Sequence, residues 1–405
     1  MKAGDTVGAL QGIRVLDLTS VVMGPFATQQ LGDLGADVIF VEPLEGSTTR
    51  RMGPGSHHQL SGIALNLLRN KRSLALDLKA PGGREAVGRV LATCDVFVTN
   101  LRPEPLRRLQ LSYPHAVAIR QNIIYCQAQG FRTGSERADD PAYDDIIQAE
   151  CGLADAARRV GGRPTLAPTI LADKVCGMAI VQCVLAALVH RERTGAGQRV
   201  EVPMLDVMQA FTLVEHGADA VARPNIGQAG YSRVLAKERG PQQTLDGWIN
   251  ILPYSRAAYE AMFRAGGRED LASDPRIQSG VAAIGRNANF LYSQLRPIIA
   301  TRTTADWLAY CKAHDIPVGT VARLEEVVGT MPIEHHPEAG AYRSVPSPVV
   351  YDRTPAGLRR PAPLVGQHTR EILQEAGYTE SDMERLDAAG TIQLAERKVS
   401  AAPAS

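Results

Sequence analysis

The 405-residue sequence has no CxxC pair, no excess of charge of one sign and no long apolar run. Its six cysteines are scattered, and a chain of this length can bury a sizeable core without disulfides, so we expect reduced thiols. The 44 basic and 43 acidic residues leave a net charge of +1. This balance lacks the strongly basic character typical of nucleic-acid-binding domains. We therefore expect no nucleic-acid partner.

The longest apolar stretch, 178–189, contains Gln182. It falls short of the roughly 20 residues that a membrane-spanning helix needs. The amino terminus has no apolar run behind Lys2, so a secretory signal is not expected. These observations predict a cytoplasmic protein with no membrane partner.

Three catalytic or binding motifs are also missing. The turn at 19–25 reads TSVVMGP and lacks GxGxxG, which disfavours a nicotinamide cofactor although Glu42 ends the next apolar run. No GxSxG occurs, so a Ser-His-Asp hydrolase is unsupported. The histidine pairs at 57–58 and 335–336 have no acidic or cysteine partner at metal spacing. We expect these pairs in solvated loops and predict no metal site.

The first 130 residues alternate strand and helix signals. Proline at position 25 suits the first turn of a helix. Short apolar runs typical of buried parallel strands occur at 13–18, 38–42, 73–78, 96–98 and 123–125. The alternation predicts a doubly wound α/β domain with ligands at the carboxyl ends of its strands.

The length favours two or three domains. We assign 1–216 to the amino-terminal part of a large domain and 217–243, rich in Gly, Ala and Arg, to a linker. Residues 244–328 have the pattern of a smaller α+β domain. Residues 329–405 comprise a proline-rich linker and a last helix.

Asp173 follows Ile170-Leu171-Ala172 and precedes a helix that we expect to open at Lys174. This places Asp173 at the N-cap, where the helix dipole favours the ionised carboxylate. An exposed carboxylate that faces a cleft is also a workable nucleophile. A structural cap and a catalytic group are compatible interpretations of this residue.

Basic residues gather in the first domain, near expected strand and helix ends. Surface arginines commonly indicate only solvation, whereas a shared phosphate-rich ligand is the alternative. The residues are Arg50, Arg51, Arg69, Lys71, Arg72, Arg102, Arg107 and Arg108.

Five blocks of sequence together resemble the class III CoA-transferase family, which includes formyl-CoA and carnitine CoA-transferases. The blocks are LQGIRVLDLTSVVMGPFATQQLGDLGADVIFVE (10–42), NKRSLALDLKAPGG (70–83), DVFVTNLRPEPLRRL (95–109), ALVHRERTGAGQRVEV (187–202) and TPAGLRRPAPLVGQHTREIL (354–373). The resemblance covers nearly the whole chain. It implies a Rossmann-like large domain built from both chain ends, a smaller domain inserted between them, and an interlocked homodimer.

The resemblance also assigns residues. Asp173 falls where the family keeps its catalytic aspartate, and backbone N–H groups at the start of its helix are the expected oxyanion donors. Coenzyme A is then a substrate, and no cofactor or metal is required. The positions at which relatives contact CoA are Val21, Met23, Lys71, Arg72, Asn100, Leu101, Arg108 and Tyr143. Among these, Lys71, Arg72 and Arg108 would serve the phosphates, and Tyr143 would lie near the thioester.

Two departures from the family pattern restrict the range of expected substrates. Val22 stands where formyl-CoA transferase has a glutamine, and that enzyme's glycine-rich lid has no match within 231–250. An oxalate or formate substrate is therefore doubtful, and the donor and acceptor acids are not determined by the sequence.

Two other functions fit parts of the same resemblance. Acyl-CoA racemases share the LAD of 171–173 but pair the aspartate with a histidine where this chain has Tyr143. Tyrosine, with a reference pKa of about 10, is a poor second base near neutral pH, so racemase is the runner-up. A non-catalytic acyl-CoA-binding protein would need no Asp173.

Overall fold

The computed structural model describes residues 8–394, which divide into two compact units. The first unit holds the residues up to Gln148, then Pro168–Gln209, and the residues from Met331 onward. Both ends of the sequence thus contribute to it. The second unit comprises Ala149–Ala167 and Ala210–Thr330, and is therefore larger than the 244–328 domain expected.

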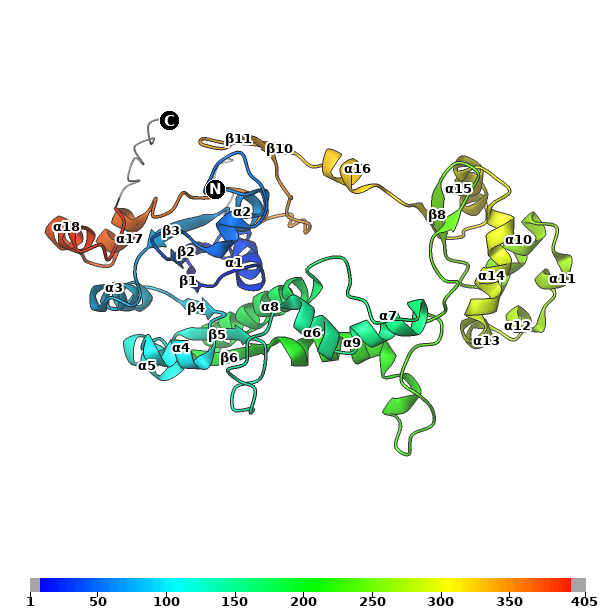
Figure 1. The fold of residues 1–405 in the computed structure, drawn as a ribbon, viewed down its shortest axis with the longest axis horizontal. Helices are drawn as coiled ribbons and strands as arrows, with labels where there is room; N and C mark the ends of the chain where they lie inside the picture. Colours follow the sequence, from blue (N-terminus) through cyan, green and yellow to red (C-terminus); the bar gives the residue numbers. More distant parts are fainter. Residues whose placement is uncertain (1–7, 395–405) are drawn as a thin grey trace, which may run out of the picture. The chain divides into compact units, whose positions relative to one another are not determined.

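A six-stranded parallel sheet forms the centre of the first unit (Figure 1), in the order β3-β2-β1-β4-β5-β6. The strand order reverses between β1 and β4, which is the position at which doubly wound sheets bind ligands. The predicted α/β class with a parallel sheet is confirmed. The strands are β1 (Arg14–Leu18), β2 (Asp37–Glu42), β3 (Lys71–Ala75), β4 (Val96–Thr99), β5 (Ile124–Gln129) and β6 (Gln198–Pro203).

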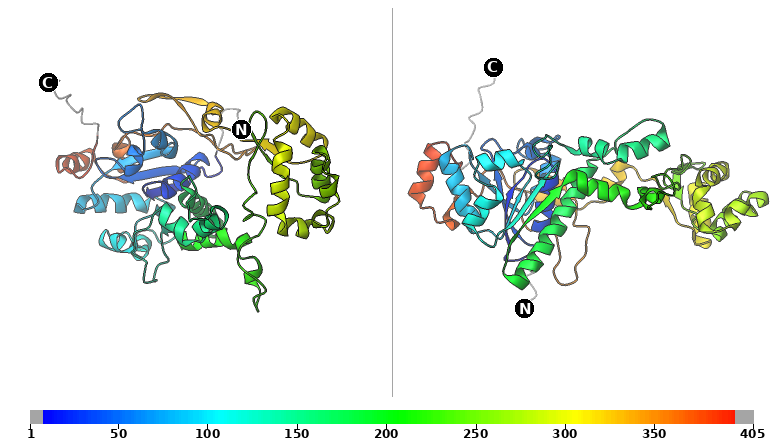
Figure 2. Two further views of the ribbon diagram at one scale, coloured as in Figure 1. Left: turned by 45° about the vertical axis from the view of Figure 1, so that its right-hand side comes forward. Right: turned by 90° about the horizontal axis from the view of Figure 1, so that it is seen from below.

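Helices cover both faces of this sheet (Figure 2), so most of its strands are buried on both sides. On one face Leu16, Phe97 and Tyr125 pack against α3 (Pro81–Ala92), α5 (Tyr113–Ile119), α17 (Thr369–Glu375) and α18 (Glu380–Ala388). On the other face α1 (Met23–Asp33) packs against α8 (Leu171–Thr194). The remaining elements of this unit are η1 (Thr48–Arg51), α2 (Gly62–Leu67), α4 (Pro103–Arg108), α6 (Asp144–Glu150), β10 (Ile333–His336) and β11 (Gly340–Arg343).

Helix α8 is longer than the apolar run at 178–189 suggested. Its 24 residues are long and apolar enough to cross a membrane, and half of the apolar window is buried within the chain. The core helix of a soluble protein passes the same test. Here α8 packs on α1, β5 and β6.

The second unit has its own core around Trp307, which is fully buried and donates its indole N–H to the Ile299 carbonyl at 2.7 Å. A three-stranded antiparallel sheet of β7 (Gln242–Gln243), β8 (Trp248–Ile251) and β9 (Val318–Thr320) belongs to it. Its helices include α10 (Arg256–Ala265), α14 (Ala288–Ile299) and α15 (Thr304–Ala313) (Figure 2). The shorter ones are α7 (Leu153–Gly161), η2 (Ala218–Val221), α11 (Glu269–Ala272), α12 (Pro275–Gln278), α13 (Val281–Arg286) and α16 (Leu324–Gly329). The residues of α9 (Met204–His216) are divided between the two units after Gln209.

Candidate active site

Asp173 lies in the first turn of α8, not at its N-cap as predicted. The helix begins at Leu171 with Ile170 at the N-cap, so Asp173 is the third helical residue. The backbone N–H of Met23, the first residue of α1, faces its carboxylate and favours the ionised form as a hydrogen-bond donor does. The side chain is therefore directed at the start of a neighbouring helix.

The Asp173 carboxyl group is buried, with 7% of the residue exposed. Burial raises its pKa to about 6, and the negative charge of Asp144 acts in the same direction. The Met23 hydrogen bond opposes both effects because it favours the ionised form. The carboxylate is thus ionised above pH about 6. It is also more basic, and so a better nucleophile, than an ordinary aspartate.

Asp144 is a site residue that the sequence reasoning missed. Its Oδ1 accepts the backbone N–H of Asp173 at 3.1 Å, and its Oδ2 accepts Gln148 Nε2 at 2.5 Å. One of the N–H groups at the start of α8 that were expected to bind the oxyanion, that of Asp173, is therefore already used by Asp144. The sequence does show two adjacent acids, Asp144 and Asp145, at the start of α6, but not which of them faces inward.

Four of the predicted CoA contacts gather where β1 and β4 end. Val21 and Met23 follow β1, whereas Asn100 and Leu101 follow the adjacent strand β4. The Asn100 amide bridges the two segments, since its Oδ1 accepts Ser20 N–H at 3.0 Å and its Nδ2 donates to the Ser20 carbonyl at 2.9 Å. Met23 links this loop to Asp173.

Arg108 and Tyr143 are open to solvent in this unit. The Arg108 side chain is 71% exposed, and its closest acidic partner is Glu104 at 3.7 Å, so its guanidinium can turn to an anionic ligand. Tyr143 is 64% exposed, and its carbonyl accepts the N–H groups of Ile146 and Ile147 at the start of α6. Tyr143 therefore lies at the start of α6, next to Asp144 in the sequence.

Lys71, in contrast, is fully buried between the sheet and α1. Its ammonium donates to Asp17 at 2.9 Å, to Thr28 Oγ1 at 2.7 Å and to the Pro25 carbonyl at 3.1 Å. All three N–H donors of the ammonium are therefore occupied. The structure leaves none of them for a phosphate, contrary to the expectation from the family pattern.

Arg72 lies at the start of β3, and its guanidinium bonds Asp37 at 2.6 Å, Glu371 at 2.9 Å and Glu375 at 2.8 Å. Asp37 begins β2, so these groups lie at the amino edge of the sheet. Asn100 lies at the carboxyl edge. We therefore leave Lys71 and Arg72 out of the CoA site proposed below.

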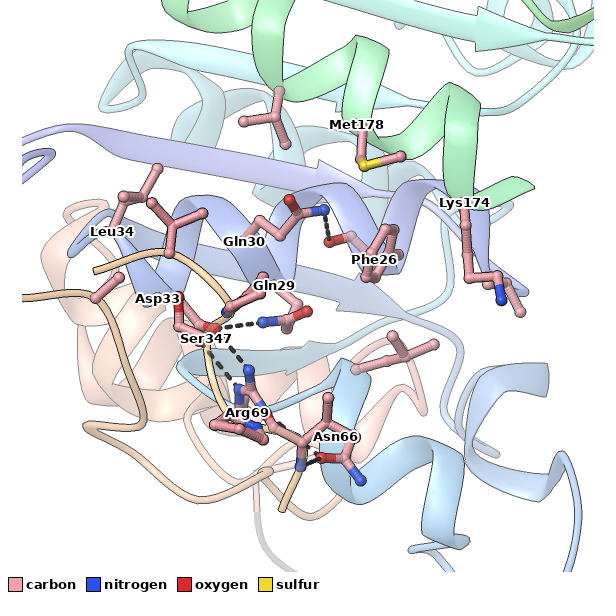
Figure 3. A pocket seen from close by; sticks show the side chains of 18 of the residues that line it. Phe26, Gln29, Gln30, Asp33, Leu34, Asn66, Arg69, Lys174, Met178 and Ser347 are labelled. Atoms are coloured by element: carbon pink, nitrogen blue, oxygen red, sulfur yellow. Dashed lines mark hydrogen bonds and ion pairs between the residues drawn. The ribbon is translucent and has the colours of Figure 1, made fainter. Parts of the chain in front are cut away.

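A hollow of about 690 Å³ lies beside the site, between α1, α2, α8 and residues 345–356 (Figure 3). Val22 and Lys174, which adjoin Met23 and Asp173 in sequence, line it. Its walls are largely apolar, with the buried Asp33–Arg69 pair at 2.6 Å among the lining residues. Within residues 8–394, no three His, Cys, Asp or Glu side chains gather as metal ligands would.

The chain is similar to known CoA-transferases. The chain is 32% identical to succinyl-CoA:glutarate CoA-transferase of Mus musculus, over 97% of this chain and 92% of the relative. It is 30% identical to succinate–glutarate CoA-transferase of Agrobacterium fabrum, over 90% and 95%. It is 29% identical to formyl-CoA:oxalate CoA-transferase of Afipia carboxidovorans, over 95% and 97%.

Solved structures with the same fold include a CAIB/BAIF family protein from Brucella suis. It has a TM-score of 0.77 and 26% identity, and the match covers 91% of this chain and all of that one. A hypothetical protein from Mycobacterium tuberculosis matches with a TM-score of 0.76 and 26% identity, over 91% and 100%. The model of CoA-transferase family III matches residues 10–369. This chain therefore belongs to CoA-transferase family III, and it is an enzyme of the CoA-transferase class.

Proposed function

We propose that this enzyme moves CoA from an acyl-CoA donor to a carboxylic acid acceptor, with Asp173 as the covalent carrier. The observation that carries the proposal is the position of Asp173. Its carboxylate is buried, has a pKa raised to about 6, and accepts the N–H of Met23 beside the loop where β1 and β4 end. Such a group is ionised at neutral pH and reactive toward a thioester carbonyl.

The first half of the reaction loads CoA onto the enzyme. An Asp173 oxygen attacks the thioester carbonyl carbon, the C–S bond breaks, and an aspartyl anhydride forms with release of CoA thiolate. The bound thiolate then attacks the aspartyl carbonyl carbon. The anhydride C–O bond breaks, the donor acid leaves as its carboxylate, and an aspartyl-CoA thioester remains.

The second half transfers CoA to the acceptor. The acceptor carboxylate attacks the aspartyl-CoA carbonyl, which releases CoA thiolate and forms a new anhydride. The thiolate attacks the acceptor carbonyl of that anhydride, and Asp173 leaves as a carboxylate. The activation of the thioester is conserved throughout, so neither ATP nor a metal is a reactant.

The chain's own groups have definite parts in these steps. The Met23 N–H faces the Asp173 carboxylate, and it can stabilise the charge that develops on the aspartyl oxygen when the thiolate or the acceptor carboxylate attacks the aspartyl carbonyl. The anhydride and thioester are prone to hydrolysis, and the burial of Asp173 limits the access of water. Val21, Met23, Asn100, Leu101, Arg108 and Tyr143 are the CoA contacts that we propose, with Arg108 at a phosphate.

The substrate class that we propose is a short dicarboxylic acid. Two relatives that the chain matches over most of its length are named for succinate or succinyl-CoA and glutarate. Val22, where formyl-CoA transferase has glutamine, argues against the formyl and oxalyl substrates named for a third relative. We also propose that two chains interlock as a homodimer in the cytoplasm.

The test is a transfer assay. The purified enzyme is mixed with succinyl-CoA and a panel of mono- and dicarboxylic acids. New acyl-CoA products are separated and identified by mass spectrometry. We expect glutaryl-CoA from glutarate, ping-pong kinetics, and no product with Asp173→Ala. An active Asp173→Ala variant would exclude the covalent role. Deuterium incorporation at the α-carbon of a 2-methylacyl-CoA, without any transfer, would support a racemase instead.

A further inference from the structure

The loop between β1 and α1 holds a valine in a backbone conformation that valine rarely adopts. Val21 has a φ of +66°, in the left-handed region. A branched side chain makes this region especially unfavourable, and such residues persist only where the surroundings enforce them. Two residues later, the Met23 N–H meets the Asp173 carboxylate. The strained residue therefore lies two residues before the N–H group that faces the candidate nucleophile.

Thr49 is the side chain that fixes this residue. Its hydroxyl lies 2.9 Å from the Val21 carbonyl, and because a carbonyl can only accept, the threonine must donate. Thr49 is fully buried in η1. The next residue, Arg50, forms a buried ion pair with Glu42 at 2.5 Å, which anchors η1 to the end of β2.

The other side of the loop is held independently of Thr49. The Asn100 amide bonds both backbone groups of Ser20. A Cβ on Gly177 of α8 would approach the Met23 carbonyl to 2.9 Å, so α1 and α8 are in close contact at this point. The peptide between Val21 and Met23 is thus the part of the loop whose direction depends on Thr49.

We infer that Thr49 is a positioning residue: by holding Val21 in the left-handed conformation it aims the Met23 N–H at Asp173. The catalytic consequence of this inference rests on the proposed function. The geometry of the loop does not depend on that function. When Thr49 is removed, Val21 is expected to relax to a negative φ and to carry the Met23 N–H away from the carboxylate. The aspartyl oxygen then loses its donor in the two steps that attack the aspartyl carbonyl, whereas CoA contacts at Asn100, Leu101 and Arg108 are unaffected.

The loss of the Met23 hydrogen bond can be detected in the pH dependence of the rate, given the charged groups around Asp173. Within the described residues, α6 contributes Asp144, whereas the only charged side chain of α1, Asp33, lies at that helix's far end. On α8, Lys174 donates to Thr169 Oγ1. The Met23 hydrogen bond lowers the Asp173 pKa, so its loss should raise that pKa and move the acid limb of the rate to higher pH.

The experiment compares Thr49→Val, which keeps the shape and removes the hydroxyl, with Thr49→Ser, which keeps the hydroxyl. Thr369→Val is the matched control, because Thr369 is equally buried and its hydroxyl instead accepts the Ala75 N–H at 3.2 Å. We expect Thr49→Val to lower kcat by tenfold or more with little change in KM for the acyl-CoA. Removing one preorganised oxyanion donor in other enzymes costs roughly 10²–10³ in kcat. Thr49→Ser and Thr369→Val should keep kcat within about threefold of the wild type.

A crystal structure of Thr49→Val separates this inference from the proposed function, since it needs no activity. A negative φ at Val21 and a lost Met23–Asp173 hydrogen bond would support the positioning role of Thr49. This holds even if every tested acyl-CoA proved inert, because inert acyl-CoAs would contradict only the proposed function. An unchanged loop with unchanged kcat and acid limb would overturn the inference. So would an equal loss of kcat in Thr49→Ser or Thr369→Val.

Discussion

At the scale of single residues, the site depends on two carboxylates with different parts. In the proposed mechanism Asp173 carries the reactive oxygen, and Asp144 accepts the Asp173 backbone N–H at 3.1 Å while raising the pKa of the Asp173 side chain. A raised pKa lowers the ionised fraction at acidic pH but makes the ionised oxygen more basic. The pair thus sets both the pH range and the nucleophilicity of the enzyme.

Asp144→Asn tests this pairing. An asparagine keeps an oxygen for the Asp173 N–H, and Gln148 can turn its amide to meet the new NH₂ group. With the charge removed, the Asp173 pKa should fall, so the acid limb of kcat/KM, expected at pH about 6, should move to lower pH. Asp145→Asn is the control, because Asp145 is adjacent but exposed. Equal shifts in both variants would contradict a specific role for Asp144.

Asp173→Asn should stabilise the fold while it abolishes transfer. The folded-state pKa of Asp173 is raised, so the ionised carboxylate destabilises the native state at neutral pH. A rise from 3.8 to about 6 corresponds to an upper limit of about 3 kcal/mol. The advantage of the variant should be full above pH about 6 and shrink as the pH falls toward 4. Urea unfolding at pH 8 and pH 4.5 measures it; a larger advantage at pH 4.5 would contradict the burial argument.

At the scale of elements, the candidate active site lies at the contact between the starts of α1 and α8. Gly177 permits this contact, because a Cβ there would lie 2.9 Å from both the Met23 carbonyl and the Phe26 ring. Any side chain must push α1 away from α8. The Met23–Asp173 hydrogen bond lies one turn from this point.

Gly177→Ala should therefore reduce both stability and kcat. Overpacking of this kind costs about 1–3 kcal/mol, and the displaced Met23 N–H should lower kcat while KM changes little. Gly88→Ala in α3 is the matched control, since its new Cβ would meet only Ile119 at 3.7 Å. That variant should be neutral or stabilised by up to about 1 kcal/mol. Equal losses in thermal melting and in kcat for the two variants would contradict the packing argument.

The sequence predicts the strands better than the site. The runs at 13–18, 38–42 and 96–98 match β1, β2 and β4 within a residue or two, because buried parallel strands are almost continuously apolar. The start of β3 was missed, since Lys71 and Arg72 do not look like a buried strand without their partners Asp17 and Asp37. The family resemblance, which assigned the two cations to CoA phosphates, gives no information about these partners either.

Family resemblance singles out Asp173 as the candidate nucleophile, but it does not predict the environment of this residue. The start of α8 was placed three residues late because Leu171 and Ala172 carry no capping signal. Asp144 and Thr49 approach Asp173 and Val21 from segments distant in sequence. Local spacing gives no information about such tertiary contacts, so neither residue could be singled out beforehand.

At the scale of the whole molecule, large apolar side chains remain exposed at the end of α9. Val214 is 87% exposed, and Phe211 and Leu213 are each 51% exposed. Clustered apolar side chains of this size are typical of protein–protein contacts. They support the proposed homodimer.

Light scattering on the eluting protein should give about twice the chain mass of 43.6 kDa. Val214→Glu places a charge on the apolar end of α9 and should lower the dimer fraction. Val281→Glu, at a valine that is 55% exposed on α13, should leave it unchanged. A wild-type protein that elutes with the mass of one chain at micromolar concentration would contradict the dimer.

The most direct test of the central claim is to trap CoA on Asp173. The enzyme is incubated with succinyl-CoA, quenched with hydroxylamine, digested and sequenced by mass spectrometry, with Asp173→Ala beside it. The account predicts a CoA adduct on the intact protein before quenching and a hydroxamate on Asp173 after it, both absent from the variant. A hydroxamate on another residue, or glutaryl-CoA formed by the wild type without any covalent adduct on rapid quenching, would contradict the role of Asp173 as the carrier.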